Sequence, residues 1–267
     1  EIRSTMPPGG INRISLGVQS LHDATLKRLG RAHSAEQARA ALSACSAEIE
    51  NVSCDLLYGV PDQEELAPTE QALELLRLGA RHLSFYHLTL ENGHFLHGSL
   101  PTDAFAWQQL HAAAEALGQR GLLHYEIASF AAPGAESRNN WNYWTGGAYL
   151  ALGPSAHGFD GKRERWSNVS DWQEYIRRAD ARESTRAWTE QVTDEQRRIE
   201  VIFTSLRTSK GLDLEAFLAE FGTDLRKSHF AWLQRWLGEG LIELDGPRLA
   251  LTFSGRMLAD EIARRLI

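Results

Sequence analysis

The segment Asn51-Val-Ser-Cys-Asp-Leu-Leu-Tyr-Gly-Val-Pro61 decides the fold of this chain. Its first eight residues are mostly apolar, and Gly59 and Pro61 follow them, which is typical of a buried strand that ends in a turn. The carboxyl group of Asp55 interrupts the apolar run. A buried carboxylate is unfavourable unless it is paired. Two interpretations of Asp55 stay open: a structural partner for a backbone or Arg group, or an acceptor for a ligand hydroxyl or ammonium group.

Strands and helices alternate on both sides of this segment. Strands are predicted at Ile11–Gln19, Asn51–Tyr58, Arg81–Leu90 and Leu122–Ile127. Helices are predicted from Ser34, which opens a capping box, to Ala47, and at Leu66–Leu78 and Asp103–Gln119. This alternation implies right-handed βαβ units and a parallel sheet. Residues 1–10 are predicted to form an irregular lead-in.

Side chains that share one face of the first two strands are small or polar. They are Ser15, Gly17 and Gln19 in the first strand, and Ser53 and Asp55 in the second, where Leu57 on the same face is the exception. A strand face under a helix should be apolar, and a packed barrel interior carries branched apolar side chains. This face therefore indicates a ligand cavity. Gln19 ends its strand at the carboxyl edge, where such sheets bind ligands, although a solvated loop side chain is the alternative.

Residues 131–170 are rich in Gly, Asn and Trp, show no clear periodicity and are expected to lack regular structure. Within them, Arg138-Asn-Asn-Trp-Asn-Tyr-Trp144 interleaves aromatic rings with amides, which suits a large, flat ligand with polar edges. Tyr143 and Trp144 could stack on such a ligand, or they could form an apolar cluster under a long loop. His157 lies in a Gly-rich loop. It is either a heme or metal ligand or a neutral side chain that is hydrogen-bonded to the backbone.

Three further positions have two interpretations each. Arg31 could hold a carboxylate or phosphate through two of its guanidinium nitrogens, or it is an exposed Arg before a capping box. Glu126 is a general acid or base, or an Arg partner, with structural pairing favoured. His94-x-x-His97 has the spacing of metal ligands, but we interpret it as a solvated turn because no companion ligand stands nearby.

The last part of the chain has a different pattern. Thr193-x-x-Gln196 caps a helix that runs to about Thr208. Helices at Asp213–Phe221 and Leu225–Leu237, a hairpin over residues 240–252 and a helix at Ser254–Leu266 are predicted after it. This order is typical of a winged-helix-like module. We therefore expect three parts, at residues 1–130, 131–188 and 189–267.

The composition excludes several classes of protein. The chain has 267 residues, 43% hydrophobic and 24% charged, with a net charge of −7, which does not suit a general nucleic-acid binder. No apolar run is long enough to cross a membrane, and nothing indicates association with a membrane surface. Cys45 and Cys54 are the two cysteines, too few for the thiolates of an iron–sulfur cluster. A reducing, cytoplasmic location is expected.

A series of short motifs resembles, in order, the radical S-adenosylmethionine (SAM) family that contains the heme chaperone HemW and, more distantly, oxygen-independent coproporphyrinogen III oxidase. The motifs are Gly17-Val-Gln-Ser20, Leu29-Gly-Arg31 with His33-Ser34, Asp55-Leu-Leu-Tyr-Gly-Val-Pro61, His82-Leu-Ser84, Leu88-Thr-Leu-Glu91, Tyr125-Glu-Ile127, Asn140-Trp-Asn-Tyr-Trp144, Tyr149-Leu-Ala-Leu-Gly-Pro154, Ala156-His157 and Arg165-Trp-Ser-Asn168. The resemblance runs from about Gly10 to the end of the chain.

The resemblance implies that Gln19, Arg31 and Asp55 contact SAM. By this comparison Arg31 pairs with the methionine carboxylate of SAM. Gln19 and Asp55 bond its ribose or its amino group. These roles agree with the polar face derived above.

The resemblance also implies a heme site. The family usually shows His-Asn-x-x-Tyr-Trp, in which the His is a proposed heme ligand, and Asn139 holds that place here. Asn is a poor iron ligand beside imidazole. The heme contacts implied are therefore Asn140, Tyr143 and Trp144, with His157 or stacking in place of the family His.

The implied fold is the later part of a partial (β/α)6 barrel, followed by the winged-helix-like module. The family's Cys-x3-Cys-x2-Cys segment, which holds a 4Fe-4S cluster, corresponds to a region upstream of Glu1 and does not occur in these 267 residues. The chain is either a fragment of a longer polypeptide or a degenerate member of the family, and we favour the fragment. By itself this chain is expected to perform no radical chemistry. The implied function is a heme chaperone that binds heme and SAM and delivers heme to acceptor proteins. The alternative is an oxygen-independent coproporphyrinogen III oxidase, which decarboxylates oxidatively in porphyrin biosynthesis.

Overall fold

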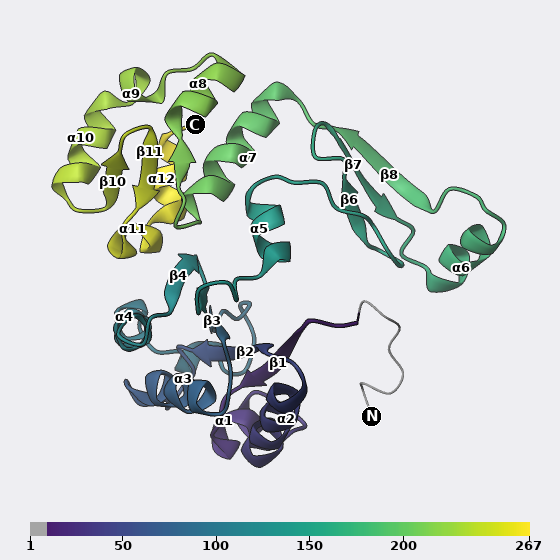
Figure 1. The fold of residues 1–267 in the computed structure, drawn as a ribbon, viewed down its shortest axis with the longest axis vertical. Coiled ribbons are helices and arrows are strands. Elements are labelled where there is room, and N and C mark those ends of the chain that lie inside the picture. Colours follow the sequence, from purple (N-terminus) through teal and green to yellow (C-terminus); the bar gives the residue numbers. More distant parts are fainter. Residues whose placement is uncertain (1–9) are drawn as a thin grey trace. The chain divides into compact units, whose positions relative to one another are not determined.

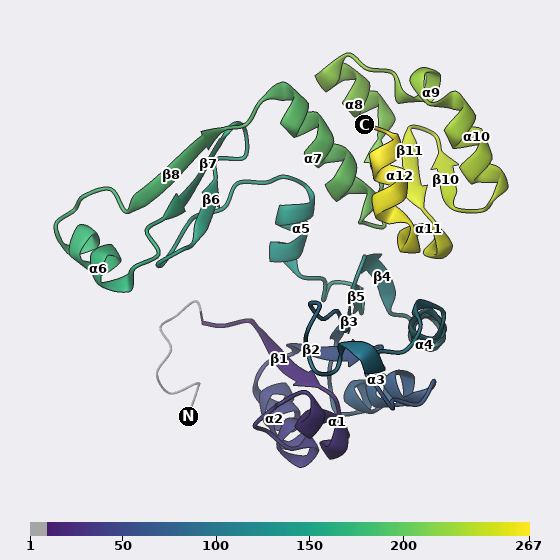
Figure 2. The same cartoon turned by 180° about the vertical axis from the view of Figure 1, so that it is seen from behind.

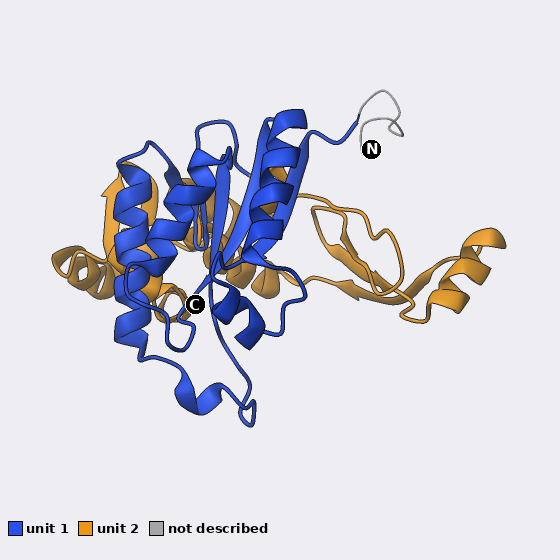
Figure 3. Cartoon of the chain, turned by 90° about the horizontal axis from the view of Figure 1, so that it is seen from below, with its two compact units in different colours: residues 1–136 blue, residues 137–267 orange. Residues whose placement is uncertain are grey.

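The computed structural model describes residues 10–267, so most of the predicted lead-in at residues 1–10 lies outside the described residues. The chain divides after Glu136 into two compact units (Figure 3). Unit 1 ends at residue 136 and unit 2 spans residues 137–267. The division into three parts at residues 130 and 188 stays a prediction. No helix described between residues 10 and 267 is long and apolar enough to cross a membrane.

Unit 1 is a five-stranded sheet with helices against it (Figure 1). Its strands are β1 (Arg13–Gln19), β2 (Asn51–Tyr58), β3 (His82–His87), β4 (Leu123–Glu126) and β5 (Ser129–Ala131). Its helices are α1 (Asp23–Arg28), α2 (Ala35–Glu48), α3 (Ala67–Arg77), the short η2 (His97–Ser99) and α4 (Asp103–Gly118). Ser34 and Gln37 form the predicted capping box at the start of α2. The sheet order is β1-β2-β3-β5-β4.

Strands β1, β2 and β3 are parallel, as the alternation of elements predicts. The prediction of a wholly parallel sheet is wrong. β5 lies between β3 and β4 and pairs antiparallel with both. A strand of three residues is too short to show a period of two, and its pairing with β3 is set by contacts distant in sequence. The unit is a mixed α/β fold, and the partial barrel stays a prediction.

The two faces of this sheet differ in the way that the alternation predicts. The face packed against α2, α3 and α4 is apolar and buried, with Val52, Cys54 and Leu56 of β2 between 0% and 1% exposed. Figures 1 and 2 both show α2 and α3 on one side of the strands. Ser15 and Gly17 of β1 project from the opposite face and are exposed. The helices thus fix which face of the sheet remains for a site.

Unit 2 contains two small antiparallel sheets. The first part holds α5 (Arg138–Trp144), β6 (His157–Phe159), β7 (Glu164–Asn168), α6 (Trp172–Asp180) and β8 (Arg186–Gln191), with sheet order β6-β7-β8. The second part holds α7 (Asp194–Leu206), β9 (Leu212–Asp213), α8 (Leu214–Phe221), α9 (Leu225–Ser228), α10 (Phe230–Gly238), β10 (Ile242–Asp245), β11 (Arg248–Leu251), α11 (Phe253–Met257) and α12 (Ala259–Arg265), with sheet order β10-β11-β9.

The prediction that residues 131–170 lack regular structure is wrong, because α5, β6 and β7 lie within them. Ser137 caps α5 by accepting a hydrogen bond from the backbone N–H of Asn140. A helix of two turns is too short to show a clear helical period. The residues of β7 and β8 are mostly half-buried or exposed on both faces, so these strands show no alternation of apolar and polar side chains.

The last part of unit 2 has the predicted helices and hairpin. Thr193 and Gln196 form the predicted capping box of α7, and β10 and β11 form the hairpin. The predicted helix at Leu225–Leu237 is broken at His229 into α9 and α10. The predicted helix at Ser254–Leu266 is likewise two helices, α11 and α12. A Cβ atom on Gly211 would lie 2.2 Å from the carbonyl oxygen of Leu249, so the close approach to β11 requires glycine.

Candidate functional site

Gln19 lies at the carboxyl end of β1 with its backbone in the left-handed region, at φ 65°. This conformation costs a non-glycine residue about 1–2 kcal/mol, and such residues cluster at binding and catalytic sites. A Cβ atom on Gly17 would lie 2.9 Å from Gln19 Nε2, so the amide group of Gln19 folds back over Gly17. The amide therefore lies on the polar face of the sheet, where the alternation of β1 predicts it.

Asp55 lies at the middle of the same face. Ser15 donates a hydrogen bond from Oγ to Asp55 Oδ1 at 3.4 Å, and Ser84 also hydrogen-bonds the carboxyl group. Burial raises the pKa of Asp55 above its ordinary value, and the bonds from Ser84 and Ser15 and the charge of Arg13 oppose that rise. The carboxyl group is thus held by side chains of β1 and β3. With these partners the carboxyl group is half-buried and lies on the polar face of the sheet.

A second set of polar side chains lies beside Asp55 and was not predicted from the sequence. Ser53 Oγ lies 2.7 Å from His82 Nδ1, and His82 Nε2 lies 2.9 Å from the hydroxyl oxygen of Tyr125. All three residues are buried. Burial and the nearby charge of Arg13 lower the pKa of His82 to about 3, so the ring is neutral at physiological pH. The network holds β2, β3 and β4 together on the polar face.

The structure brings Arg31 to the same end of β1 as Gln19. His33, two residues beyond Arg31, hydrogen-bonds the backbone carbonyl of Val18 through Nε2 at 3.1 Å. Arg31 itself is exposed, and no carboxylate of residues 10–267 forms an ion pair with it. Its guanidinium group is therefore available to an anionic ligand group at the carboxyl end of β1.

Buried glutamines hold the loops at this end of the sheet. Gln71 of α3 accepts hydrogen bonds through Oε1 from the backbone N–H of Leu21 at 2.5 Å and from Ser20 Oγ at 3.1 Å. Gln109 of α4 accepts one from the N–H of Gly59 at 2.8 Å, and its Nε2 donates to the carbonyl of Glu64. In the sequence, the feature that could have revealed these bonds is a Gln on the buried face of α3 and another on the buried face of α4.

In unit 2, three predicted heme residues share one face of α5. Asn140, Tyr143 and Trp144 are spaced by three and four residues, which places them on neighbouring turns. Tyr143 is 47% exposed and makes an edge contact with Tyr149 at 4.9 Å between ring centroids. These rings form an aromatic surface that is accessible to a flat ligand.

His157 is exposed at the start of β6. Tyr149 forms a β-bridge with Phe159, and their ring centroids are 6.1 Å apart. Since residues two apart on a strand share a face, His157 projects from the same face as Phe159. The structure thus connects Tyr143 and His157 only indirectly, through the rings of Tyr149 and Phe159.

The other candidates have structural partners. Glu126 is 3% exposed and accepts a hydrogen bond from the backbone N–H of Ala128, and its pairing with an Arg stays a prediction. His94 stacks on Phe95, and His97 opens η2. No three His, Cys, Asp or Glu side chains of the described chain are grouped to hold a metal ion. The residues present therefore do not fit a 4Fe-4S cluster, and burial raises the pKa of the Cys54 thiol to about 12.

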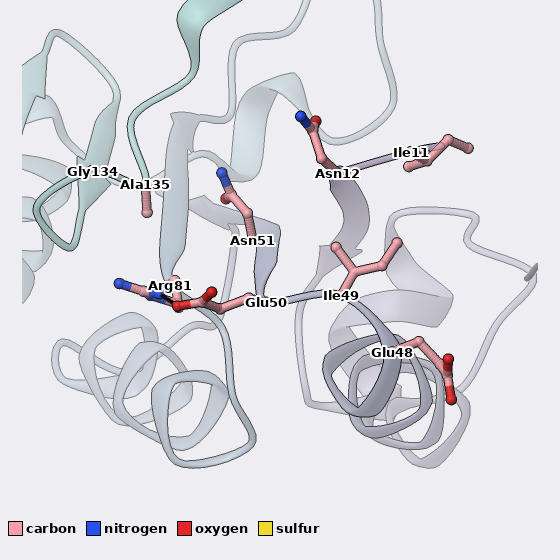
Figure 4. A pocket seen from close by; sticks show the side chains of 9 residues that line it. All are labelled: Ile11, Asn12, Glu48, Ile49, Glu50, Asn51, Arg81, Gly134 and Ala135. Atoms are coloured by element: carbon pink, nitrogen blue, oxygen red, sulfur yellow. Dashed lines mark hydrogen bonds and ion pairs between the residues drawn. The ribbon is translucent and has the colours of Figure 1, made fainter. Parts of the chain in front are cut away.

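A hollow in unit 1 lies at the opposite end of the strands (Figure 4). Its lining comes from the starts of β1, β2 and β3 and from the loop after β5. Arg81 and Glu50 form an ion pair there, and Arg13 Nη1 donates to Asn51 Oδ1 at 2.7 Å. Ligands of parallel α/β sheets bind at the carboxyl ends of strands. This hollow contains none of the predicted site residues, and the charges of Arg81 and Glu50 in it are paired with each other.

Comparison with known proteins places these residues in a family. Residues 192–258 match the model of the HemN C-terminal domain. The chain is 32% identical to the heme chaperone HemW of Mycobacterium tuberculosis strain H37Rv, over 100% of this chain and 68% of that protein. It is 29% identical to the heme chaperone HemW of Bacillus subtilis, over 95% of this chain and 69% of that protein.

A solved structure is also similar. Coproporphyrinogen III oxidase (HemN) from Escherichia coli, described as a radical SAM enzyme, superposes with a TM-score of 0.75 at 20% identity. The superposition covers 96% of this chain and 64% of that chain, so this chain spans about two thirds of the length of these relatives. At this identity the structural likeness establishes the fold. The similarity to HemW extends over the whole length of this chain. The chain therefore belongs to the HemW/HemN-like family of radical SAM proteins.

Proposed function

We propose that the protein to which this chain belongs is a HemW-like heme chaperone that binds SAM and heme and delivers heme to acceptor proteins. The polar face of unit 1 is the observation that carries this proposal. It presents the Gln19 amide and the Asp55 carboxyl group on one face, and Arg31 follows at the same strand end. These groups complement the amino, hydroxyl and carboxylate groups of SAM.

Each residue has a defined task in this proposal. Arg31 holds the methionine carboxylate through two parallel hydrogen bonds. Gln19 and Asp55 accept hydrogen bonds from the amino or ribose groups, and Ser15 and Ser84 orient the Asp55 carboxyl group. A 4Fe-4S cluster bound elsewhere in the protein would supply the electron for reductive cleavage of SAM. The described residues of this chain bind and orient SAM and carry no cluster ligands.

The aromatic surface of α5 and β6 supports the heme part of the proposal. Tyr143 and Trp144 supply rings for stacking, and Asn140 supplies an amide group one turn before them. His157 is an exposed imidazole on the face of β6 that carries Phe159. Aromatic planes with a few polar groups are the usual lining of sites for flat cofactors.

The test uses the full-length native protein, purified without oxygen. Titration with hemin, followed at the Soret band, is expected to saturate at one site, and the loaded protein is expected to transfer heme to an apo-hemoprotein. Incubation with SAM, a reductant and coproporphyrinogen III is expected to leave the porphyrinogen propionates intact. Oxidative decarboxylation of these propionates would establish the oxidase alternative and overturn the chaperone proposal.

A substitution at residue 139 tests the heme surface directly. Asn139 and Tyr143 are both exposed and lie four residues apart on α5, so a His at position 139 would be one turn from the Tyr143 ring. Asn139→His is expected to shift the Soret band and tighten heme binding, because imidazole is a far better iron ligand than an amide. An unchanged spectrum would show that heme does not bind at this face of α5.

A further inference from the structure

The backbone makes a tight, strained turn at Gln19. The N–H of Ser20 donates to the carbonyl of Val18 at 2.8 Å, and Gln19 between them has a φ of 65°. This combination is the γ-turn with a positive central φ, the rare and strained form. The register of β1 against β2 also shifts between Leu16 and Gln19. A strained conformation persists only where the surrounding structure holds it, so neighbouring groups have to supply that hold.

Hydrogen bonds hold the turn on both sides. Before the turn, Nε2 of His33 lies 3.1 Å from the carbonyl oxygen of Val18. After the turn, Oε1 of Gln71 accepts a bond from the backbone N–H of Leu21 at 2.5 Å and another from Ser20 Oγ at 3.1 Å. A single side chain of α3 thus fixes both of the residues that follow the turn.

The amide group of Gln71 is buried and has one possible orientation. Gln71 is 3% exposed, Ser20 0% and Leu21 3%, so water does not reach these bonds. A backbone N–H only donates, so Oε1 and not Nε2 has to face Leu21. Nε2 has no hydrogen-bond partner in the described part of the chain. The accepting oxygen is therefore the part of the Gln71 amide that holds the turn.

Loss of this oxygen would leave the N–H of Leu21 and the hydroxyl group of Ser20 buried without an acceptor, which is unfavourable. The strained turn is the part of the loop that gains free energy by relaxing. A return of φ at Gln19 from 65° to the extended region would swing its side chain away from Gly17, over which the amide now lies. Gln71 thus controls the direction of the Gln19 side chain through the backbone.

We propose that Gln71 is a positioning residue. Through its bonds to Ser20 and Leu21 it holds the turn at Gln19 in the conformation that presents the Gln19 amide to a ligand. This role rests on the proposed binding of SAM through Gln19. It belongs to a residue of the helix layer that touches no ligand. Substitution of Gln71 therefore changes SAM affinity only as far as the Gln19 amide contributes to it.

The test compares three substitutions in the full-length protein by calorimetric titration with SAM. Gln71→Leu removes the accepting oxygen. Gln71→Glu keeps it and loses no hydrogen bond, because Nε2 has no partner in the described part of the chain. Gln109→Leu is the matched control, because Gln109 is 0% exposed and also bonds a loop backbone, at Gly59 and Glu64 after β2. Circular dichroism checks that each variant folds.

Gln71→Leu is expected to weaken SAM binding by about two- to tenfold, the effect of one lost hydrogen bond. Gln71→Glu and Gln109→Leu are expected to keep the wild-type affinity. If Gln71→Leu binds SAM like the wild type, the positioning role is wrong while the proposed function stands. A loss of the same size in Gln109→Leu, or in Gln71→Glu, would also overturn the role, because neither variant removes the acceptor of Leu21.

A double-mutant cycle separates positioning from a merely structural role. Gln19→Ala removes the amide that Gln71 is proposed to direct. In that background Gln71→Leu is expected to cause no further loss of SAM affinity, because two residues that act through one contact are not additive. An equal loss in both backgrounds would show that Gln71 affects SAM binding independently of Gln19.

Amide hydrogen exchange tests the anchor without any ligand. Gln71→Leu is expected to speed exchange at residues 20–22, because the N–H of Leu21 loses its acceptor. Unchanged protection there overturns the proposal. If the wild type binds no SAM, the proposed function fails, and the exchange rates alone decide whether Gln71 holds the turn. Should Gln71→Leu not fold, Ser20→Ala removes one of the two donors to Gln71 and takes its place, with the same expected and contrary outcomes.

Discussion

The five-stranded sheet of unit 1 and the β6-β7-β8 sheet of unit 2 differ in the kind of side chain that they offer to a ligand and in how deeply it is buried. In the first sheet, polar groups on the polar face are buried, and Ser53, His82 and Tyr125 form hydrogen bonds with one another there. The second leaves aromatic rings at its surface, with Tyr143 nearby at 47% exposed and Trp188 of β8 at 45%. Fixed donors and acceptors select a small polar ligand by geometry, whereas exposed rings bind a flat ligand by area.

The comparison teaches where each unit is sensitive to change. A buried network loses a whole interaction when one partner is removed, because the remaining group is left unpaired. An exposed aromatic surface loses a fraction of its contact area. Substitutions in unit 1 should therefore have the larger effects, and the four predictions below run from the largest to the smallest.

The buried His82 should make unit 1 sensitive to acid. Its pKa is lowered to about 3 in the folded state, so the unfolded chain binds the extra proton first. The free energy of unfolding therefore falls as the pH is lowered from about 6.5 toward 3, by at most about 1.4 kcal/mol per pH unit and about 5 kcal/mol in total. Urea unfolding at several pH values measures this slope. His82→Gln should flatten it, and the exposed His111→Gln should not.

Asp55→Ala should weaken SAM binding by about 10- to 100-fold, the range for a hydrogen bond to a charged group. The same substitution should raise the free energy of unfolding at neutral pH. The raised pKa of Asp55 means that the folded state binds its proton more tightly than the unfolded chain, so ionisation destabilises the fold. Calorimetry and urea unfolding measure the two effects. Unchanged SAM affinity would show that the polar face is not the binding face.

Tyr125→Phe should lower the free energy of unfolding by about 1–3 kcal/mol, because it leaves His82 Nε2 without its partner in a buried place. The control is Tyr143→Phe, which removes a hydroxyl group from an exposed ring and should stay within about 0.5 kcal/mol of the wild type. Chemical unfolding followed by circular dichroism compares the two. Equal stabilities would contradict a buried network that holds β4 to β3.

Tyr143→Ala should weaken heme binding by about two- to tenfold, the contribution of one aromatic contact. Trp172→Ala on α6 is the control, because Trp172 is 61% exposed and lies on a different element from the rings around Tyr149. Hemin titrations at the Soret band provide the affinities. A larger loss at Trp172 than at Tyr143 would move the heme surface from α5 to α6.

Much of unit 1 could be predicted because its signals are local. The bounds of β2 are Asn51–Tyr58 in the structure as in the prediction, and the alternation of small and polar residues in β1 and β2 identified the polar face. The capping boxes of α2 and α7 were likewise recognisable from four residues each.

The rest depends on pairing between distant residues. Ser53 and His82 are 29 residues apart, and His82 and Tyr125 are 43 apart. No local period reveals such bonds. β5 has three residues, and the strands of the β6-β7-β8 sheet show no apolar alternation, so the antiparallel pairings had no signal in the sequence. The assignment of these residues to SAM and heme came from the family resemblance, and their roles stay predictions.

The position of β1 has a consequence for handling this chain in solution. β1 is the first strand in the order β1-β2-β3-β5-β4, so among the described residues one of its edges has no neighbouring strand. A free edge offers unpaired backbone donors and acceptors to other chains. The exposed Gly17 adds no side chain that would block such an approach. Isolated as these 267 residues, the protein should self-associate increasingly with concentration, and a proline at an outward-facing N–H of β1 should suppress it.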